Sequence, residues 1–231
     1  MKELYFSGAG GFYPYLMGIG KFLQDNYNLE NIVFTGNSSS SYITLLLALN
    51  IPFDIAYEEH LKIMKDISTY TFGPLYNYYD IAKKHLYKYF YENPVDVKKI
   101  KNLFIQITNT NNSFNYNNWE SIFVNEWNDI EDLLNCMRSS SYIPFYGSSI
   151  TNEYRGMCCI DGGVNYYLKD GSHSTCKFEK SKYIRTDMWR EIPYRWYFIY
   201  SDDEWNNKLY NLGYEDAQKN KEELDSFFNE E

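Results

Sequence analysis

Three short segments carry residue types that could together hydrolyse an acyl ester. Ser38 lies in the stretch Gly36-Asn37-Ser38-Ser39-Ser40, a glycine-rich stretch occupies 8–11, and Asp161-Gly162-Gly163 lies far downstream. Ester hydrolysis by a serine needs a nucleophile, donors for a developing oxyanion and a base that takes the hydroxyl proton. Each segment alone is weakly specific, but the three in this order predict a serine hydrolase.

Ser38 is the candidate nucleophile. It follows the apolar run 31–35 and precedes a stretch that is apolar nearly all round, so we expect it on a tight turn between a strand and a buried helix. A helix N-terminus there favours developing negative charge. The strict elbow pattern is G-x-S-x-G. Gly36 fits the pattern, whereas Ser40 replaces its last glycine, and serine is the next tolerable size.

The glycine-rich stretch is the candidate oxyanion loop. It follows an apolar N-terminal run and precedes Pro14, which suits the first turn of a helix. Backbone N–H groups of such a loop can face inward to hold an anion. The alternative is a phosphate-binding loop, which is less favoured because the Lys-Ser/Thr ending is missing and G-x-G-x-x-G stops at Tyr13. The proposed donors are Gly8, Ala9, Gly10 and Gly11.

Asp161 is the candidate base, and Gly162 and Gly163 would allow close backbone approach beside it. The commonest use of Asp-Gly is a turn in which Asp caps its own backbone, and this interpretation would be preferred for the segment alone. A Ser-His-Asp triad through His173 has the expected chain order but is less favoured than a Ser-Asp dyad, because 171–174 resembles a polar loop. His60 and His85 lie on helical stripes and are interpreted as packing residues.

Strands that alternate with helices must position these groups, which predicts an α/β domain with a largely parallel sheet. Strands are expected at 3–7, 31–35, 103–108, 121–127, 157–160 and 195–201. Helices are expected from Pro14, over 39–49, from Phe53 to Met64, around 81–93, after a capping box at Asn128 and Glu131, and over 203–228 with a break or bend near Gly213. The aromatic segment 70–79 is interpreted as packing, with a lid or membrane anchor as the alternative.

The amino-acid composition restricts which classes of partner the protein is expected to bind. The chain has 231 residues with 44% hydrophobic residues and a formal net charge of −9, concentrated in an acidic C-terminal stretch. We expect one globular domain that does not bind nucleic acid. The four cysteines contain no C-x-x-C pair and the three histidines are scattered, so a zinc site is not expected. No apolar run is long enough to span a bilayer and no signal peptide is evident, which predicts a cytoplasmic protein with at most peripheral contact to a lipid surface.

With these motifs in this order, the chain resembles the patatin-like phospholipase family, and especially its animal-type triglyceride lipase branch. Matching is weak between residues 53 and 138 but otherwise covers nearly the whole chain. The segments that carry the resemblance are Phe6-Ser7-Gly8-Ala9-Gly10-Gly11-Phe12, Gly36-Asn37-Ser38, Ser140-Ser141-Tyr142-Ile143-Pro144-Phe145-Tyr146, Ile160-Asp161-Gly162-Gly163-Val164 and Leu209-Tyr210-Asn211-Leu212-Gly213-Tyr214-Glu215-Asp216-Ala217.

The resemblance implies a three-layer α/β/α sandwich with a mostly parallel central sheet. It implies a single domain over 1–231, with a motif core at 4–168 and a late strand and acidic helix at 169–231. It also implies an esterase that cleaves the fatty-acyl esters of phospholipid or acylglycerol through a Ser38-Asp161 dyad and an acyl-enzyme. Because Tyr13 and Ser40 replace motif glycines, a catalytically impaired lipid-binding or scaffolding protein remains an alternative, as does a lipid transacylase.

Overall fold

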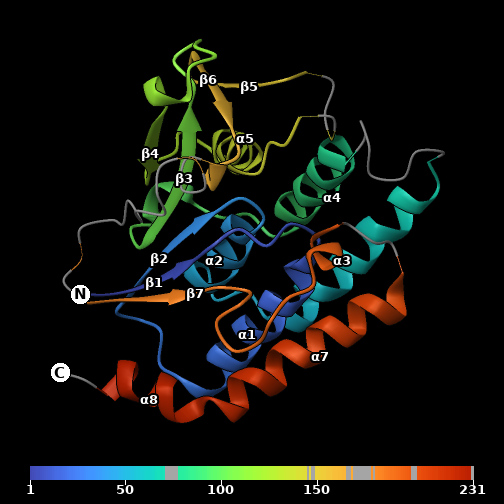
Figure 1. Cartoon of the computed structure of the whole chain (residues 1–231), viewed down its shortest axis with the longest axis vertical. Helices are drawn as coiled ribbons and strands as arrows, with labels where there is room; N and C mark the ends of the chain where they lie inside the picture. The colour runs from blue at the N-terminus through green and yellow to red at the C-terminus, as the bar shows by residue number, and fades with distance from the viewer. Residues whose placement is uncertain are drawn as a thin grey trace.

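A seven-stranded sheet forms the centre of the part of the chain that the computed structural model describes, namely residues 1–70, 78–144, 146, 149–164, 168, 178, 180–198 and 202–229 (Figure 1). The strands are β1 (Lys2–Phe6), β2 (Ile32–Asn37), β3 (Leu103–Asn109), β4 (Glu120–Val124), β5 (Asn152–Tyr154), β6 (Met157–Ile160) and β7 (Lys180–Ile184). Their order is β5-β6-β3-β2-β1-β7, with β4 also paired to β3. The middle of the sheet, from β7 to β3, is parallel, whereas β4, β5 and β6 pair antiparallel.

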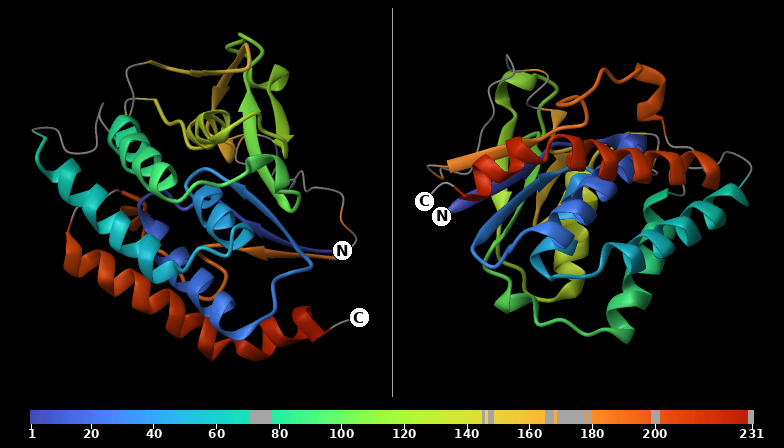
Figure 2. Two further views of the ribbon diagram at one scale, coloured as in Figure 1. Left: turned by 180° about the vertical axis from the view of Figure 1, so that it is seen from behind. Right: turned by 90° about the horizontal axis from the view of Figure 1, so that it is seen from below.

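Helices flank this sheet, and the expected α/β class is confirmed (Figure 2). The helices are α1 (Tyr13–Asn26), α2 (Ser40–Ala48), α3 (Phe53–Ser68), α4 (Tyr78–Glu92), α5 (Ile130–Ser140), α7 (Asp203–Lys219) and α8 (Lys221–Asn229). The described residues also form four short 3₁₀ helices: η1 (Gly10–Phe12), η2 (Val97–Lys99), η3 (Tyr116–Asn118) and η4 (Tyr194–Tyr197). The arrangement is consistent with the α/β/α sandwich expected from the sequence.

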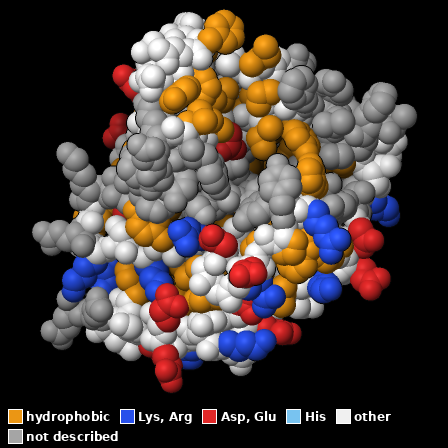
Figure 3. All heavy atoms as spheres, in the orientation of Figure 1, with side chains coloured by type: hydrophobic (Ala, Val, Ile, Leu, Met, Phe, Trp, Pro, Cys, Tyr) orange, Lys and Arg blue, Asp and Glu red, His pale blue; other side chains and the backbone are white. Residues whose placement is uncertain are grey.

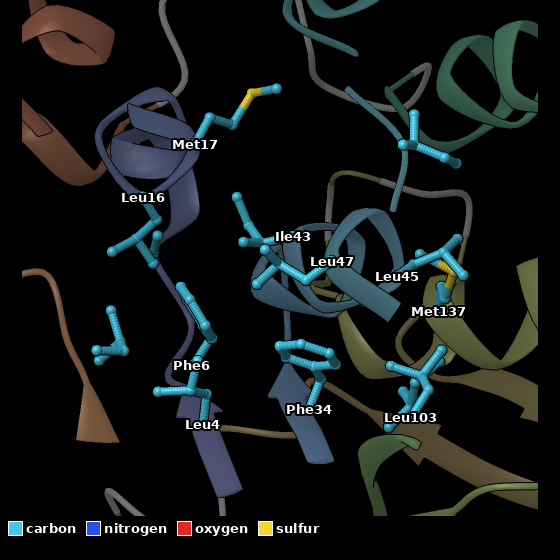
Figure 4. Close-up of a cluster of buried hydrophobic side chains, with 14 of the residues drawn as sticks. Leu4, Phe6, Leu16, Met17, Phe34, Ile43, Leu45, Leu47, Leu103 and Met137 are labelled. Carbon is cyan, nitrogen blue, oxygen red and sulfur yellow. The ribbon is translucent and has the colours of Figure 1, made fainter. Parts of the chain in front are cut away.

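The apolar face of the sheet packs against α1, α2 and α5. Figure 4 shows Phe6 and Phe34 from neighbouring strands pointing toward Leu16 of α1 and Ile43 of α2, and all four side chains are fully buried. Burying one such side chain stabilises a fold by about 1.5–3 kcal/mol. Since α1 and α2 each follow directly on a strand of this face, the packing fixes the turns that join β1 to α1 and β2 to α2.

The opposite face of β1, β2 and β7 carries buried polar side chains. The carboxylate of Glu3, which is fully buried, accepts hydrogen bonds from the hydroxyls of Thr35 and Ser181. Asn37 donates from Nδ2 to the hydroxyl of Tyr5 at 2.6 Å. Buried polar groups cost little stability when they are paired in this way. The network holds the residue that immediately precedes Ser38.

Strand β3 is long enough to pair with two strands along the same edge. Its first half pairs with β2 as far as Asn37 opposite Gln106, and its last residues pair with β6, where Thr108 lies opposite Ile160. Because β6 runs antiparallel to β3, its C-terminal end points back toward the end of β2. The sheet therefore brings Asp161, which follows β6, to the place where Ser38 follows β2.

Three sequence-based expectations are wrong in their detail. Helix α7 continues through Gly213, because that glycine is where α7 meets α1: a Cβ there would lie 1.9 Å from the carbonyl oxygen of Tyr15. The strand expected at 195–201 is replaced over Tyr194–Tyr197 by η4, and residues 199–201 lie outside the described ranges. Helix α5 is capped by Asp129, whose side chain accepts from the backbone N–H of Asp132, so the capping residue is one position later than predicted.

On the face drawn in Figure 3, charged side chains concentrate in one part, whereas hydrophobic side chains appear in both parts. The charged side chains gather in the lower part of the view, over β7 and α7, and the other part lies above it, around β3, β6 and α5. Within the described ranges, no helix combines the length and apolar character that a bilayer span requires. Of the aromatic segment 70–79, residues 71–77 lie outside the described residues.

Candidate active site

Ser38 sits on a strained turn between β2 and α2. Its backbone φ is +53°, in the left-handed region that a residue with a side chain rarely adopts, and the residue is 6% exposed. Such a conformation costs about 1–3 kcal/mol and persists where surrounding contacts enforce it. Here the enforcing contacts are to Ser140, whose carbonyl oxygen and Oγ accept from the Ser38 N–H at 3.1 and 2.9 Å. The turn has the geometry expected of a nucleophile elbow.

The glycine-rich loop 8–11 is in close contact with this turn. A Cβ at Gly8 would lie 2.7 Å from the Cβ of Ser38 and 3.3 Å from its Oγ, so only glycine allows the approach. The N–H of Ala9 donates to the Oγ of Ser39 at 3.2 Å. In the described part of the chain the N–H groups of Gly10 and Gly11 have no hydrogen-bond acceptor. Both residues lie in η1, directly ahead of α1, whose N-terminal dipole favours an anion.

The four predicted donors therefore have different surroundings. Gly8 supplies the close approach, Ala9 donates to a side chain, and Gly10 and Gly11 keep unbonded N–H groups. Gly10 has a φ of +52° and lines the cavity of about 30 Å³ that also contacts Ser38. Of the four predicted donors, Gly10 is thus the one that lines the cavity at Ser38 and also has an unbonded N–H group; the N–H groups of Gly8 and Gly11 likewise have no acceptor among the described residues.

Asp161 is buried, 8% exposed, and held by its own loop. Its Oδ1 accepts from the N–H of Gly163 at 2.8 Å, and its backbone N–H donates to the carbonyl oxygen of Tyr142 at 2.9 Å. Oδ2 has no hydrogen-bond partner among the described residues. The Asx-type bond to Gly163 is the capping role that Asp-Gly commonly has. It uses one carboxylate oxygen and leaves the other free.

Burial raises the pKa of Asp161 from 3.8 to about 6, and the Ser38 hydroxyl and the Gly163 N–H oppose this shift. Ser38 and Asp161 are close because the carbonyl oxygen of Ser140 accepts from the N–H groups of both Ser38 and Gly162, although no hydrogen bond joins the Ser38 and Asp161 side chains in the described structure. Catalytic hydrogen bonds are often loose without substrate. A carboxylate with a pKa near 6 is a stronger base than an ordinary aspartate and is still ionised at neutral pH.

Ser140 joins the two halves of the site. Its carbonyl oxygen accepts from the N–H of Gly162 at 2.7 Å as well as from Ser38, and its Oγ donates to the carbonyl oxygen of Gln106 on β3 at 2.6 Å. The backbone of Gly162 is in close contact with β3, since a Cβ on Gly162 would be 2.1 Å from the Gln106 carbonyl oxygen. One residue at the end of α5 thus fixes the positions of the Ser38 and Asp161 backbones relative to each other.

Ser40 and Gly36, which also support the turn at Ser38, both fit against the neighbouring elements. The Oγ of Ser40 donates to the carbonyl oxygen of Ser7 at 2.5 Å, so the serine that replaces the elbow glycine makes a hydrogen bond to the adjacent loop. Gly36 packs against α2, where a Cβ would lie 2.6 Å from the Oγ1 of Thr44. Tyr13 lines a different cavity, between α2, α3 and α4, and does not line the cavity at Ser38.

The histidines do not complete a triad in the described residues. His60 is buried and hydrogen-bonded to Asn206, and burial lowers its pKa to about 4. His85 bonds the carboxylate of Asp66 at 2.8 Å between α4 and α3. Neither lines the cavity at Ser38. His173 lies outside the described ranges.

Several residues at the site were not predicted to act there. Besides Ser140, they include Tyr42, Tyr79 and Ile143, which line the cavity at Ser38. The hydroxyl of Tyr79 donates to the carbonyl oxygen of Ser141 and accepts from the N–H of Ile143 at 2.7 Å, which ties α4 to the segment after Ser140. The segment from Ser140 to Tyr146 carries part of the family resemblance, but its spacing in the sequence gives no sign of this bridging role.

Comparison with known proteins adds one finding on the fold. Neither a protein-family sequence model nor a curated protein sequence matches the chain. Among solved structures, the chain is similar to the heterodimeric complex ExoU–SpcU from the type III secretion system of Pseudomonas aeruginosa, with 14% sequence identity and a TM-score of 0.49. The match covers 100% of this chain and 52% of that chain, so this chain spans about half of its length.

Proposed function

We propose that this protein is a serine acyl hydrolase in which Ser38 is the nucleophile and Asp161 the base. One observation carries the proposal: a serine in left-handed backbone lies beside a buried carboxyl group whose pKa is raised to about 6 and whose Oδ2 has no hydrogen-bond partner among the described residues. Strained backbone and a raised carboxyl pKa are each associated with functional sites. Their meeting at the ends of two strands supports a catalytic role.

In the first half of the reaction, the Oγ of Ser38 attacks the carbonyl carbon of the ester and its proton passes to the Oδ2 of Asp161. The tetrahedral oxyanion is stabilised by the N–H groups of Gly10 and Gly11. The carbon–oxygen bond to the alcohol then breaks, Asp161 returns the proton to the departing oxygen, and acyl-Ser38 remains. Water repeats the sequence through the same base and releases the carboxylic acid.

The resemblance to patatin-like phospholipases favours fatty-acyl esters of phospholipid or acylglycerol as the substrate class, with peripheral contact to a lipid surface. No cofactor takes part in the proposed steps. An alcohol in place of water would give a transacylase that uses the same residues. Product analysis with an added acylglycerol acceptor distinguishes these two outcomes.

A second candidate is a lipid-binding protein without catalysis. It is favoured by the absence of a hydrogen bond between Ser38 and Asp161 in the described structure. Against it, Tyr13 and Ser40, the two departures from the motif, do not fill the cavity at Ser38.

The test compares wild type with Ser38→Ala and Asp161→Asn in hydrolysis of p-nitrophenyl butyrate and in labelling by a fluorophosphonate probe. We expect labelling only where Ser38 is present, and hydrolysis that falls by a factor of roughly 10³ or more in both variants. Equal rates in all three proteins, with no labelling of wild type, would exclude the dyad and leave the binding function.

A further inference from the structure

An apolar cavity of about 80 Å³ lies between α2, α3 and α4. Much of its wall is aliphatic or aromatic, with Leu45 and Leu46 from α2, Ile63 from α3, and Leu86 and Phe90 from α4. Cavities that take small molecules have this predominantly apolar lining with few polar groups. Leu45 and Phe90 also belong to the hydrophobic core, and this apolar wall suits a hydrocarbon ligand.

This cavity adjoins the one at Ser38. Three residues, Ser39, Tyr42 and Tyr78, line both spaces. These three residues therefore form a boundary that the two spaces share. The part of an acyl ester that extends away from the reacting carbonyl is a hydrocarbon chain, which matches the lining.

Tyr13 forms a wall of this cavity and stands where the resembled motif has a glycine. Its ring lies 5.3 Å from the imidazole of His60, centroid to centroid, and burial near Tyr42 and Tyr78 raises the pKa of its phenol. The backbone of Tyr13 is helical, with φ −49° and ψ −44°, and the residue begins α1, so the helix fixes the direction of the side chain. His60 adds a buried Nε2 without a hydrogen-bond partner in the described residues.

Size decides what such a space can hold. A cavity of about 150 Å³ holds one benzene molecule, with its six carbon atoms. The apolar cavity measures about 80 Å³ and the space at Ser38 about 30 Å³. A longer chain would have to displace a lining side chain such as Tyr13, or pack hydrocarbon against the polar lining groups, which include Glu59 and His60 Nε2; packing of that kind is unfavourable.

We propose that this cavity receives the acyl chain of the substrate and that Tyr13 limits the hydrocarbon beyond the reacting carbonyl to about four to five carbons. The inference rests on the proposed hydrolase function, and it narrows the substrate class from fatty-acyl esters in general to esters of short acyl chains. Tyr13 is then a specificity residue, and its replacement of the motif glycine is compatible with activity.

The experiment measures kcat/KM for p-nitrophenyl acetate, hexanoate and decanoate with wild type and three variants. Tyr13→Ala removes the wall, Tyr13→Phe removes only its hydroxyl, and Ala82→Leu adds bulk from α4, where Ala82 lines the cavity. Thermal melts confirm that each variant is folded. Binding of hexanoate and decanoate is measured in parallel by calorimetry on Ser38→Ala and on Ser38→Ala with Tyr13→Ala.

We expect wild type and Tyr13→Phe to favour hexanoate over decanoate by at least roughly tenfold, Tyr13→Ala to lose this preference, and Ala82→Leu to shift the preference to acetate. Decanoate should bind only when Tyr13→Ala is present. An unchanged length profile in Tyr13→Ala and Ala82→Leu, or equal decanoate binding with and without Tyr13, overturns the inference. If wild type cleaves no ester but Tyr13→Ala gains decanoate binding, the hydrolase proposal fails while the chain site stands.

Discussion

Removing the Oγ of Ser140 should disable catalysis while leaving the protein folded. The substitution Ser140→Ala deletes the acceptor of the Ser38 N–H at 2.9 Å and the donor to the Gln106 carbonyl oxygen at 2.6 Å. The carbonyl oxygen of Ser140, which also accepts from Ser38 and Gly162, remains in place. The perturbation thus loosens the connection between the two halves of the site without breaking it.

The magnitude follows from the two lost hydrogen bonds. Each contributes about 1 kcal/mol to the free energy of unfolding, so the variant should lose about 2 kcal/mol, which lowers the Tm of a chain of this size by roughly 4–8 °C. The activity should suffer more, because Ser38 is held in left-handed backbone that relaxes when a restraint is removed. A displacement on the order of 1 Å can reduce the rate about 100-fold.

Ser139→Ala is the matched control. Ser139 and Ser140 are both fully buried, and the Oγ of Ser139 likewise makes two hydrogen bonds, to the carbonyl oxygen of Asn135 at 2.9 Å and from Nδ2 of Asn152 at 2.5 Å. None of these atoms contacts Ser38 or the Asp161 loop through a hydrogen bond. We expect the same loss of stability with nearly unchanged activity.

The assay measures kcat and KM for p-nitrophenyl butyrate together with thermal melts of the three proteins. We expect kcat to fall by roughly 10- to 100-fold in Ser140→Ala with little change in KM, since the loss concerns alignment rather than substrate binding. Equal kcat in the two variants, or a kcat in Ser140→Ala within about twofold of wild type, would refute the role given to this side chain.

Three other outcomes follow from the site and from the docking of α7. Because the pKa of Asp161 is raised from 3.8 to about 6 on folding, kcat/KM should rise with pH around 6. For the same reason the folded protein should lose on the order of 2–3 kcal/mol of stability as pH rises from 4 to 6. Asp161→Asn should remove both effects and melt at a higher temperature than wild type at pH 8 but not at pH 4. Gly8→Ala should abolish labelling of Ser38 by a fluorophosphonate, because the new Cβ would lie 2.7 Å from the Ser38 Cβ; normal labelling would show that the loop can move. Arg190→Met should cost about 3–5 kcal/mol in chemical denaturation by leaving the carboxylate of Asp216, 6% exposed, without its guanidinium partner, and a loss below about 1 kcal/mol would show that the hydrogen bond from Tyr15 suffices.

The sequence predicted the groups that lie on turns at strand ends, because glycine, serine and aspartate mark such turns locally. Ser38 and Asp161 were predicted as a pair in this way, and the structure brings them together at one edge of β3. Their predicted roles in catalysis remain proposals. Ser140 could not be predicted as a bridge, since its contacts to Ser38 and Gly162 depend on how α5 ends against the sheet.

Other errors have a similar origin in tertiary contact. Gly213 indicated a break by its low helix propensity, yet it is required where the backbones of α1 and α7 meet. The strand Lys180–Ile184 was missed because its lysines and serine gave no apolar alternation, although backbone pairing with β1 makes it a strand of the sheet. Local propensity thus identified most elements but not the ones defined by a partner far along the chain.

The register of β6 on β3 also sets the distance between Ser38 and Asp161. This register can change only in steps of whole residues. Side chains alternate between the two faces of a strand, so a slip of β6 by one residue, from Ile160 opposite Thr108 to a neighbour, would turn Asp161 toward the other face of the sheet. A slip by two residues would keep its face but move it by roughly 6.8 Å along β3. The register of β6 on β3, rather than the length of the turn at Arg155 and Gly156 between β5 and β6, therefore sets the distance between serine and carboxylate. An insertion in that turn would alter the β5–β6 hairpin, whereas an added residue between Ile160 and Asp161 would displace the carboxylate directly.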